Sequence, residues 1–219
     1  MKTGIVKYDC GNITSVLNAF RKIGSEVELV EKPEDLHAYD LVVLPGVGAF
    51  ENAMQSLRDT GFYTALQALY QRGDTPIIGI CLGLQLMCNS SQEDGKHTGF
   101  GWIDAEVVPL RDFNAQLKVP HMGWNDIQAK NTHTFFDEKL SGKDFYFVHS
   151  YCVKVNNAAQ CIATCDYATE FACIAANGPA FGMQFHPEKS QMTGLHLLQW
   201  IVDARKQQLA TLNGEASHA

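Results

Sequence analysis

The chain has 219 residues, of which 46% are hydrophobic and 19% are charged, values typical of a globular protein with a substantial core. Its formal net charge of −7 and its lack of a basic run argue against nucleic-acid binding. No apolar run is long enough for a membrane span or a secretory signal, so we expect a cytoplasmic protein without membrane association.

Strands and helices alternate over the first 90 residues. We predict strands at residues 4–8, 26–30, 40–48 and 76–80. Helices are expected at 12–24, at 51–73 as one helix or as two split near Gly61, and from Leu82 onward. This order favours an α/β fold with a mostly parallel central sheet flanked by helices.

Short strand candidates follow one another in the second half, which predicts an additional antiparallel strand region. They lie at residues 102–110, 144–155, 161–167, 171–177 and 180–185. A last helix is expected over about 193–209. We therefore predict a single domain over residues 1–210 and a flexible tail over 211–219.

The seven cysteines are an odd number in a chain large enough to fold without crosslinks, so we expect reduced thiols that mostly fill the core. Cys161, Cys165 and Cys173 are close in sequence but alternate with apolar residues and lack the paired spacing of zinc ligands. We expect neither a metal nor another cofactor.

Cys81 stands where a predicted strand meets a predicted helix, with Gly79 and Gly83 two residues away on either side. A nucleophile on a sharp strand-to-helix turn needs small neighbours at these positions, and G-x-C-x-G is the thiol counterpart of the G-x-S-x-G elbow. A helix N-terminus also lowers the pKa of a thiol, and the N–H of Leu82 would point toward an oxyanion. The alternative is that Cys81 is a small core residue.

The segment "FGMQFHPEKS" supplies a base for this thiol. Residues two apart in an extended segment point to the same side, so His186 and Glu188 can reach one site. Pro187 favours an extended His186. The imidazole can accept the thiol proton while the carboxylate orients the ring. A lone polar histidine at a strand end is the competing interpretation.

The segment "LVVLPGVGAF" carries a buried strand into Pro45 and two glycines. The N–H groups of Val47 and Gly48 would be further oxyanion donors facing Cys81, although an ordinary strand-end turn has the same pattern. There is no third glycine, so this is not a dinucleotide-binding fingerprint.

Five segments, "LPGVGAF", "GICLGLQLM", "VPHMGWN", "YFVHSY" and "FGMQFHPEKS", together resemble a class I (triad) glutamine amidotransferase over residues 4 to about 205. The third and fourth are most similar to the glutaminase subunits of imidazole glycerol phosphate synthases. The resemblance implies catalytic roles for Cys81, His186 and Glu188, with Leu82, Val47 and Gly48 in the oxyanion hole. It implies glutamine binding by Gly46, Gln85, Ser150 and Tyr151.

The resemblance also implies a reaction and a partner. Glutamine would be hydrolysed to glutamate and ammonia through a cysteinyl thioester. The ammonia would pass to a (β/α)8-barrel synthase subunit, in a heterodimer, that makes imidazole glycerol phosphate and aminoimidazole carboxamide ribotide. Positions expected at the partner interface or its gate are Asn12, His121, Met122, Trp124, Asn125, Tyr146 and Lys189. Trp124 has the alternative of filling the core.

Other functions stay open on the sequence. The family usually has D-Y-G-x-G-N after the first strand, whereas this chain has "KYDCGN", which differs at Lys7, Asp9 and Cys10 but matches at Gly11 and Asn12. That difference raises the alternative of a protein that supplies ammonia to another synthase, for example one of surface-sugar biosynthesis. A cysteine hydrolase or chaperone of related architecture and a non-catalytic binding protein are further alternatives.

Overall fold

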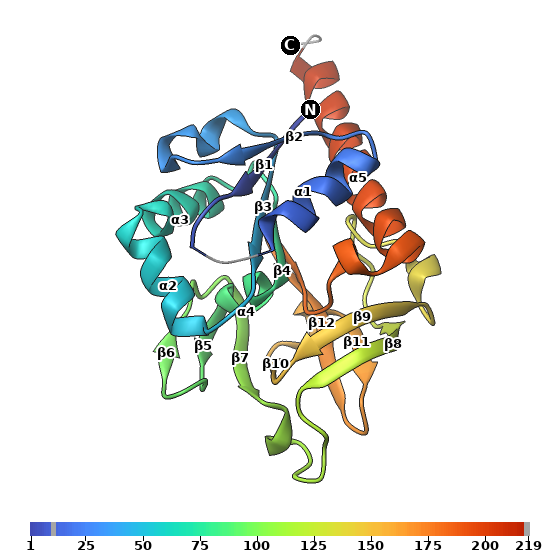
Figure 1. The fold of residues 1–219 in the computed structure, drawn as a ribbon. Coiled ribbons are helices and arrows are strands. Elements are labelled where there is room, and N and C mark those ends of the chain that lie inside the picture. Colours follow the sequence, from blue (N-terminus) through green and yellow to red (C-terminus); the bar gives the residue numbers. More distant parts are fainter. Residues whose placement is uncertain (10–11, 217–219) are drawn as a thin grey trace.

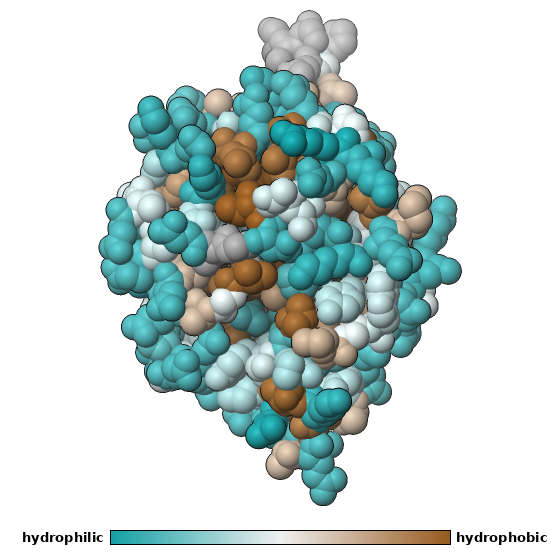
Figure 2. Space-filling view, viewed as in Figure 1, coloured by the Kyte–Doolittle hydropathy of each residue, from teal (hydrophilic) through white to brown (hydrophobic). Residues whose placement is uncertain are grey.

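A computed structural model of the protein describes residues 1–9 and 12–216. Cys10 and Gly11, which belong to the loop that departs from the family pattern, lie outside the described residues. No helix in the described ranges is both long and apolar enough to cross a membrane. The face seen in Figure 2 is mostly hydrophilic, with several separate hydrophobic areas.

One sheet of thirteen strands, counted over the described residues, runs through the molecule (Figure 1). The strands are β1 Lys2–Val6, β2 Glu26–Val30, β3 Leu41–Gly46, β4 Ile77–Cys81, β5 Cys88–Ser91, β6 His97–Thr98, β7 Ile103–Pro109, β8 His121–Ala129, β9 Asp144–His149, β10 Tyr151–Val155, β11 Cys161–Asp166, β12 Glu170–Asn177 and β13 Ala180–Met183. The main path of the sheet is β2-β1-β3-β4-β13-β12-β10-β7-β5-β6, and β11, β8 and β9 branch from it.

Helices cover both faces of the parallel part of this sheet (Figure 1). They are α1 Ile13–Lys22, α2 Phe50–Asp59, α3 Phe62–Arg72, α4 Leu82–Leu86 and α5 Gln191–Ala216. Side chains of α1 and α5 belong to one buried apolar cluster, and those of α2, α3 and α4 belong to another. The two clusters lie on opposite faces of the sheet, as expected when strands are buried on both sides.

The predicted parallel half is confirmed. Strand β1 pairs in parallel with β2 and β3, and β3 pairs in parallel with β4. The predicted helical stretch 51–73 forms two helices, because Gly61 between them has a φ of +80°, which favours glycine. The helix after Cys81 is short and ends at Leu86.

The second half is mainly antiparallel, as predicted, with β7, β10, β12, β11, β8 and β9 joined in antiparallel pairs. Three strands were not predicted: β5, β6 and β8. Strand β8 contains the segment "HMGWN". Its glycine and asparagine are typical of turns, so the sequence did not indicate an extended conformation. Helix α5 continues to Ala216, beyond its predicted end near 209, so the described part of the expected tail 211–219 is helical.

The register of β13 brings the two halves together. This strand pairs antiparallel with β12 but parallel with β4, where Met183 lies opposite Ile80. On the other side of β4, Gly46 of β3 lies opposite Cys81. Strands β3, β4 and β13 are therefore neighbours whose carboxyl ends meet at one edge, which is where α/β sheets carry their binding sites.

Candidate active site

Cys81 lies on a strained turn between β4 and α4. Its φ of +53° and ψ of −107° are unusual for a residue with a side chain. A β-carbon on Gly83 would lie 1.9 Å from the carbonyl oxygen of Leu44, and one on Gly79 would lie 2.7 Å from backbone atoms of Gly83. The turn thus requires both glycines, as the elbow motif predicts.

The predicted base and the predicted carboxylate lie together in the interior. The Nδ1 atom of His186 is 2.7 Å from Oε1 of Glu188, and their side chains are 1% and 0% exposed. The side-chain amide of Asn12 donates to the same Oε1 at 2.5 Å. Because the carboxylate accepts the Nδ1 proton, His186 directs its other nitrogen, Nε2, away from Glu188. Among the described residues Nε2 has no hydrogen-bond partner.

The environment of His186 favours its protonated form. Burial lowers the pKa of the ring, but the neighbouring Cys81 thiol and the Glu188 carboxylate outweigh it and raise this pKa to about 9. The sulfur of Cys81 is thus close enough to interact electrostatically with the ring, and it accepts a hydrogen bond from Gln184 at 3.7 Å. Sulfur, imidazole and carboxylate converge, as the sequence predicts.

Cys81 and His186 face a cavity of about 350 Å³. Its wall contains the following described residues: Val47, Gly48, Cys81, Leu82, Gln85, Glu93, Pro120, Val148, His149, Ser150, Tyr151 and His186. Every predicted oxyanion residue, and three of the four predicted glutamine-binding residues, is therefore at the cavity. Gly46 is not in the wall. Its α-carbon faces Tyr8, and a β-carbon built on it would lie 2.8 Å from the Tyr8 hydroxyl oxygen.

Gln85 is held by bonds that the sequence did not reveal. Its amide nitrogen donates to the carbonyl of Tyr151 and to Oε1 of Gln184, each at 3.1 Å. Gln184 is fully buried and connects Gln85 to the sulfur of Cys81. The available signal was its place two residues before His186, on the same side of an extended segment.

Two more residues at the site were missed by sequence reasoning. Glu93 brings a carboxylate to the cavity wall, where Oε2 accepts the backbone N–H of Phe50 at 2.7 Å. Ser190 is fully buried, donates to the carbonyl of His186 at 2.6 Å and accepts the N–H of Tyr146. Ser190 therefore fixes the backbone that carries His186. Neither residue could be selected from the sequence, because an acidic or hydroxyl side chain in a loop does not by itself indicate a functional site.

Four of the predicted interface residues form an outer group. Met122 and Trp124 on β8 are 62% and 45% exposed, which excludes the core interpretation of Trp124. The Trp124 ring meets the edge of Tyr146 with centroids 5.9 Å apart, and the ammonium of Lys189 lies 6.0 Å from the Tyr146 ring. Met192, which sequence reasoning did not select, is 73% exposed and lines a shallow hollow with Trp124.

The other three predicted interface residues are bonded to the protein itself. His121 is 2% exposed and its Nδ1 lies 3.0 Å from His149. Asn125 donates to the carbonyl of Asp166 at 2.8 Å, and Asn12 donates to Glu188. These side chains were selected by resemblance, and each makes a hydrogen bond within the chain; their place at a partner interface stays a prediction.

Sequence comparison relates this chain to known proteins. The sequence model of the glutamine amidotransferase class-I family matches residues 6–202. The imidazole glycerol phosphate synthase subunit HisH of Moorella thermoacetica is 41% identical over 195 residues, which cover 89% of this chain and 91% of that protein. The HisH subunit of Natronomonas pharaonis is 43% identical over 204 residues, covering 91% and 93%.

Solved structures share the fold at low sequence identity. A crystal structure of a glutamine amidotransferase superposes with a TM-score of 0.69 at 16% identity, covering 93% of this chain and 98% of the other. The structure of PurLQS from Thermotoga maritima gives a TM-score of 0.70 at 17% identity, covering 92% and 97%. The family model over residues 6–202, together with relatives that are 41% and 43% identical, shows that the chain belongs to the class I glutamine amidotransferase family.

Proposed function

We propose that this protein is the glutaminase subunit of an imidazole glycerol phosphate synthase, active in cytoplasmic histidine biosynthesis. The observation that carries this proposal is the buried His186–Glu188 pair beside Cys81 on its strained turn. The names of the relatives, which describe subunits of that synthase at about 40% identity, support the choice of pathway. The whole of residues 1–210 would act as one amidotransferase domain.

The reaction would proceed in two steps at Cys81. The sulfur reacts as a thiolate whose proton is held on Nε2 of His186, and it attacks the side-chain amide carbon of glutamine. When the C–N bond breaks, the same nitrogen returns a proton to the departing ammonia, which leaves a γ-glutamyl thioester. Water, activated by His186, then releases glutamate and regenerates the thiol. A raised pKa at His186 suits a group that must hold this proton between transfers.

The tetrahedral intermediate carries a negative charge on its oxygen, and hydrogen-bond donors must be in place to stabilise that charge. The N–H of Leu82, at the start of α4, and those of Val47 and Gly48 are the candidates on the cavity wall. Gly48 has a φ of +110°, so its peptide can change orientation at low cost. Because one such donor is worth about 10²–10³ in rate, rotation of this peptide would suffice to switch the isolated chain to low activity.

The amino-acid end of the glutamine substrate also needs hydrogen-bond partners. Its ammonium group requires acceptors, and Glu93 supplies a carboxylate on the cavity wall. Gln85 uses its amide nitrogen for Tyr151 and Gln184, which leaves its oxygen as an acceptor for the substrate. The main chain at Ser150 and Tyr151 completes that wall.

The ammonia requires an acceptor enzyme. A (β/α)8-barrel synthase subunit bound over Met122, Trp124 and their neighbours would receive it in a heterodimer, since large exposed apolar side chains are good interface anchors. Purification of the chain with its synthase partner, followed by assay of glutamate and of synthase product, tests the function. We expect slow glutamine hydrolysis by the chain alone and fast hydrolysis by the complex with its acceptor substrate. Failure of that complex to hydrolyse glutamine, or co-purification with a different synthase, would contradict the proposal.

A further inference from the structure

Two histidines that take no part in the proposed chemistry form a buried pair beside the cavity. His121 of β8 and His149 of β9 are register partners in the antiparallel β8–β9 ladder. Nδ1 of His121 lies 3.0 Å from Nε2 of His149, and Nδ1 of His149 lies 2.8 Å from the carbonyl oxygen of Tyr151. The residues are 2% and 6% exposed.

The carbonyl of Tyr151, which ends this series of hydrogen bonds, determines which nitrogen of each ring carries the proton. A carbonyl oxygen only accepts, so Nδ1 of His149 must carry hydrogen toward Tyr151. A neutral imidazole has one N–H, so Nε2 of His149 is an acceptor, and Nδ1 of His121 must then donate to it. The tautomers of the two rings are thereby set in one direction. Burial, which lowers the pKa of His149 to about 3 and that of His121 to about 4, keeps both rings neutral.

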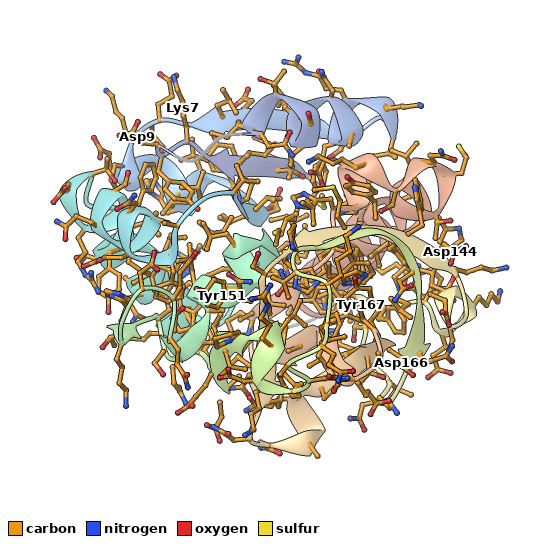
Figure 3. The ribbon with its side chains drawn as sticks, turned by 60° about the horizontal axis from the view of Figure 1, so that its bottom comes forward. Lys7, Asp9, Asp144, Tyr151, Asp166 and Tyr167 are labelled. Atoms are coloured by element: carbon orange, nitrogen blue, oxygen red, sulfur yellow. The ribbon has the colours of Figure 1, made fainter. Side chains whose placement is uncertain are left out.

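Aromatic side chains enclose the pair. The ring of His121 stacks between Tyr167 and Phe147, with centroid distances of 3.9 Å and 4.8 Å. Figure 3 shows Tyr151 and Tyr167 on the face of the molecule that comes forward in that view. The hydroxyl of Tyr167 donates to the carbonyl of Lys118, which holds this cover in place. The pair is therefore packed among rings in the interior, where the low local dielectric strengthens its hydrogen bonds.

The same carbonyl of Tyr151 also receives the amide of Gln85. Hydrogen bonds thus run from His121 through His149, Tyr151, Gln85 and Gln184 to the sulfur of Cys81. We propose that His121 and His149 are positioning residues that hold the Tyr151 carbonyl, and with it Gln85, in the orientation that binds glutamine. This proposal rests on the proposed glutaminase function and assigns a role within that site.

The test compares two variants of His149 in the complex with the synthase partner. His149→Phe keeps an aromatic ring beside Phe147 and Phe171 but removes both nitrogens. His149→Asn keeps a donor near the position of Nδ1. We expect the KM for glutamine to rise about tenfold in His149→Phe, the effect of one buried hydrogen bond, with kcat within about threefold of the original. His149→Asn should recover KM to within about threefold.

His133→Asn is the matched control, because that half-buried ring stacks on Phe181 and is absent from the cavity wall. A loss of folded protein alone would lower kcat and leave KM unchanged. An unchanged KM in His149→Phe, or a KM in His149→Asn no better than in His149→Phe, would overturn the assignment while the unaltered complex still hydrolysed glutamine. An inactive unaltered complex would instead contradict the proposed function.

A second measurement needs no activity or variant. Nitrogen-15 NMR of the histidine rings in the unaltered full chain should show Nδ1 protonated and Nε2 unprotonated in both His121 and His149. A proton on Nε2 of His149 would break the chain of donors and overturn the proposal.

Discussion

At the scale of single residues, Oε1 of Glu188 is the acceptor on which the arrangement of the base depends. It accepts from both His186 and Asn12. Asn12 has a φ of +73°, a conformation that asparagine tolerates better than most residues. Asparagine therefore suits this position twice, because it accepts the backbone turn and supplies the side-chain donor to Glu188. We therefore expect Asn12 to help position the proposed base through Glu188.

Removal of the Asn12 amide tests that role. Asn12→Gly tolerates the positive φ but loses the donor, so Glu188 holds His186 less firmly. We expect kcat for glutamine hydrolysis by the complex to fall about tenfold, the effect of one hydrogen bond to a charged group. Asn156→Gly is the control, since Asn156 is exposed, hydrogen-bonds to Asp104 and is absent from the cavity wall. Equal rates in the two variants would contradict the role.

The raised pKa of His186 makes a prediction about stability. The folded protein holds this proton up to a pH of about 9, whereas the unfolded chain releases it near 6.5. The stabilisation is therefore complete below pH 6.5 and is lost as the pH rises through 9, by up to about 3 kcal/mol. Denaturant unfolding at pH 6.5 and pH 9 should show a larger loss in the original protein than in His186→Asn, which keeps a donor to Glu188 but cannot titrate. Equal losses in both would show that His186 does not hold the proton.

Sequence singled out the proposed catalytic residues more readily than the residues that hold them in place. Cys81, His186 and Glu188 carry their chemistry in the side chain and stand at recognisable spacings, so each could be selected in advance. Gln184 and Ser190 act through bonds to residues far along the chain, and the contact of Asn12 with Glu188 joins positions 176 residues apart. Only the folded structure shows such pairs.

At the scale of elements, the approach of α4 to β3 decides whether Cys81 can occupy its turn. The α-carbon of Gly83 lies against the carbonyl of Leu44, where a methyl group cannot fit. This contact also holds Leu82, with its N–H, at the cavity.

A single added methyl group tests this packing. Gly83→Ala would place carbon 1.9 Å from a backbone oxygen, so β3 and α4 must separate. We expect the free energy of unfolding to fall by about 3 kcal/mol or more and glutaminase activity to be lost. Gly214→Ala, at an exposed position in the last turns of α5, should change stability by less than about 1 kcal/mol. A Gly83→Ala protein as stable as the control would disprove the packing argument.

Elements were predicted well where their periodicity was clear. The strands and helices of the parallel half follow plain apolar patterns, so they were found with their order. Strand β8 was missed because its glycine and polar residues indicate a turn, and its pairing with β9 and β11 is set by tertiary contacts. The parallel pairing of β13 with β4, which creates the site, has no local signal at all.

At the scale of the whole molecule, the outer group of Met122, Trp124, Tyr146 and Lys189 is the expected docking surface for the synthase partner. We predict that Trp124→Ala raises the Kd of the complex at least about tenfold, because a central tryptophan is a typical interface hot spot. Trp200→Ala is the matched control, since Trp200 is similarly exposed, at 40% against 45%, but lies on α5 and donates to Thr134. Titration calorimetry with the purified partner measures both. Equal Kd values would place the partner elsewhere.

The most direct test of the whole account is Cys81→Ala in the purified complex, assayed first with glutamine and then with ammonium chloride as the nitrogen source. We predict that glutamine-dependent synthesis falls at least about 10³-fold, because the nucleophile is gone, while ammonium-dependent synthesis stays within about twofold. Cys161→Ala, which alters a half-buried thiol on β11, should leave both activities intact. Persistence of glutamine-dependent synthesis in Cys81→Ala would contradict the account.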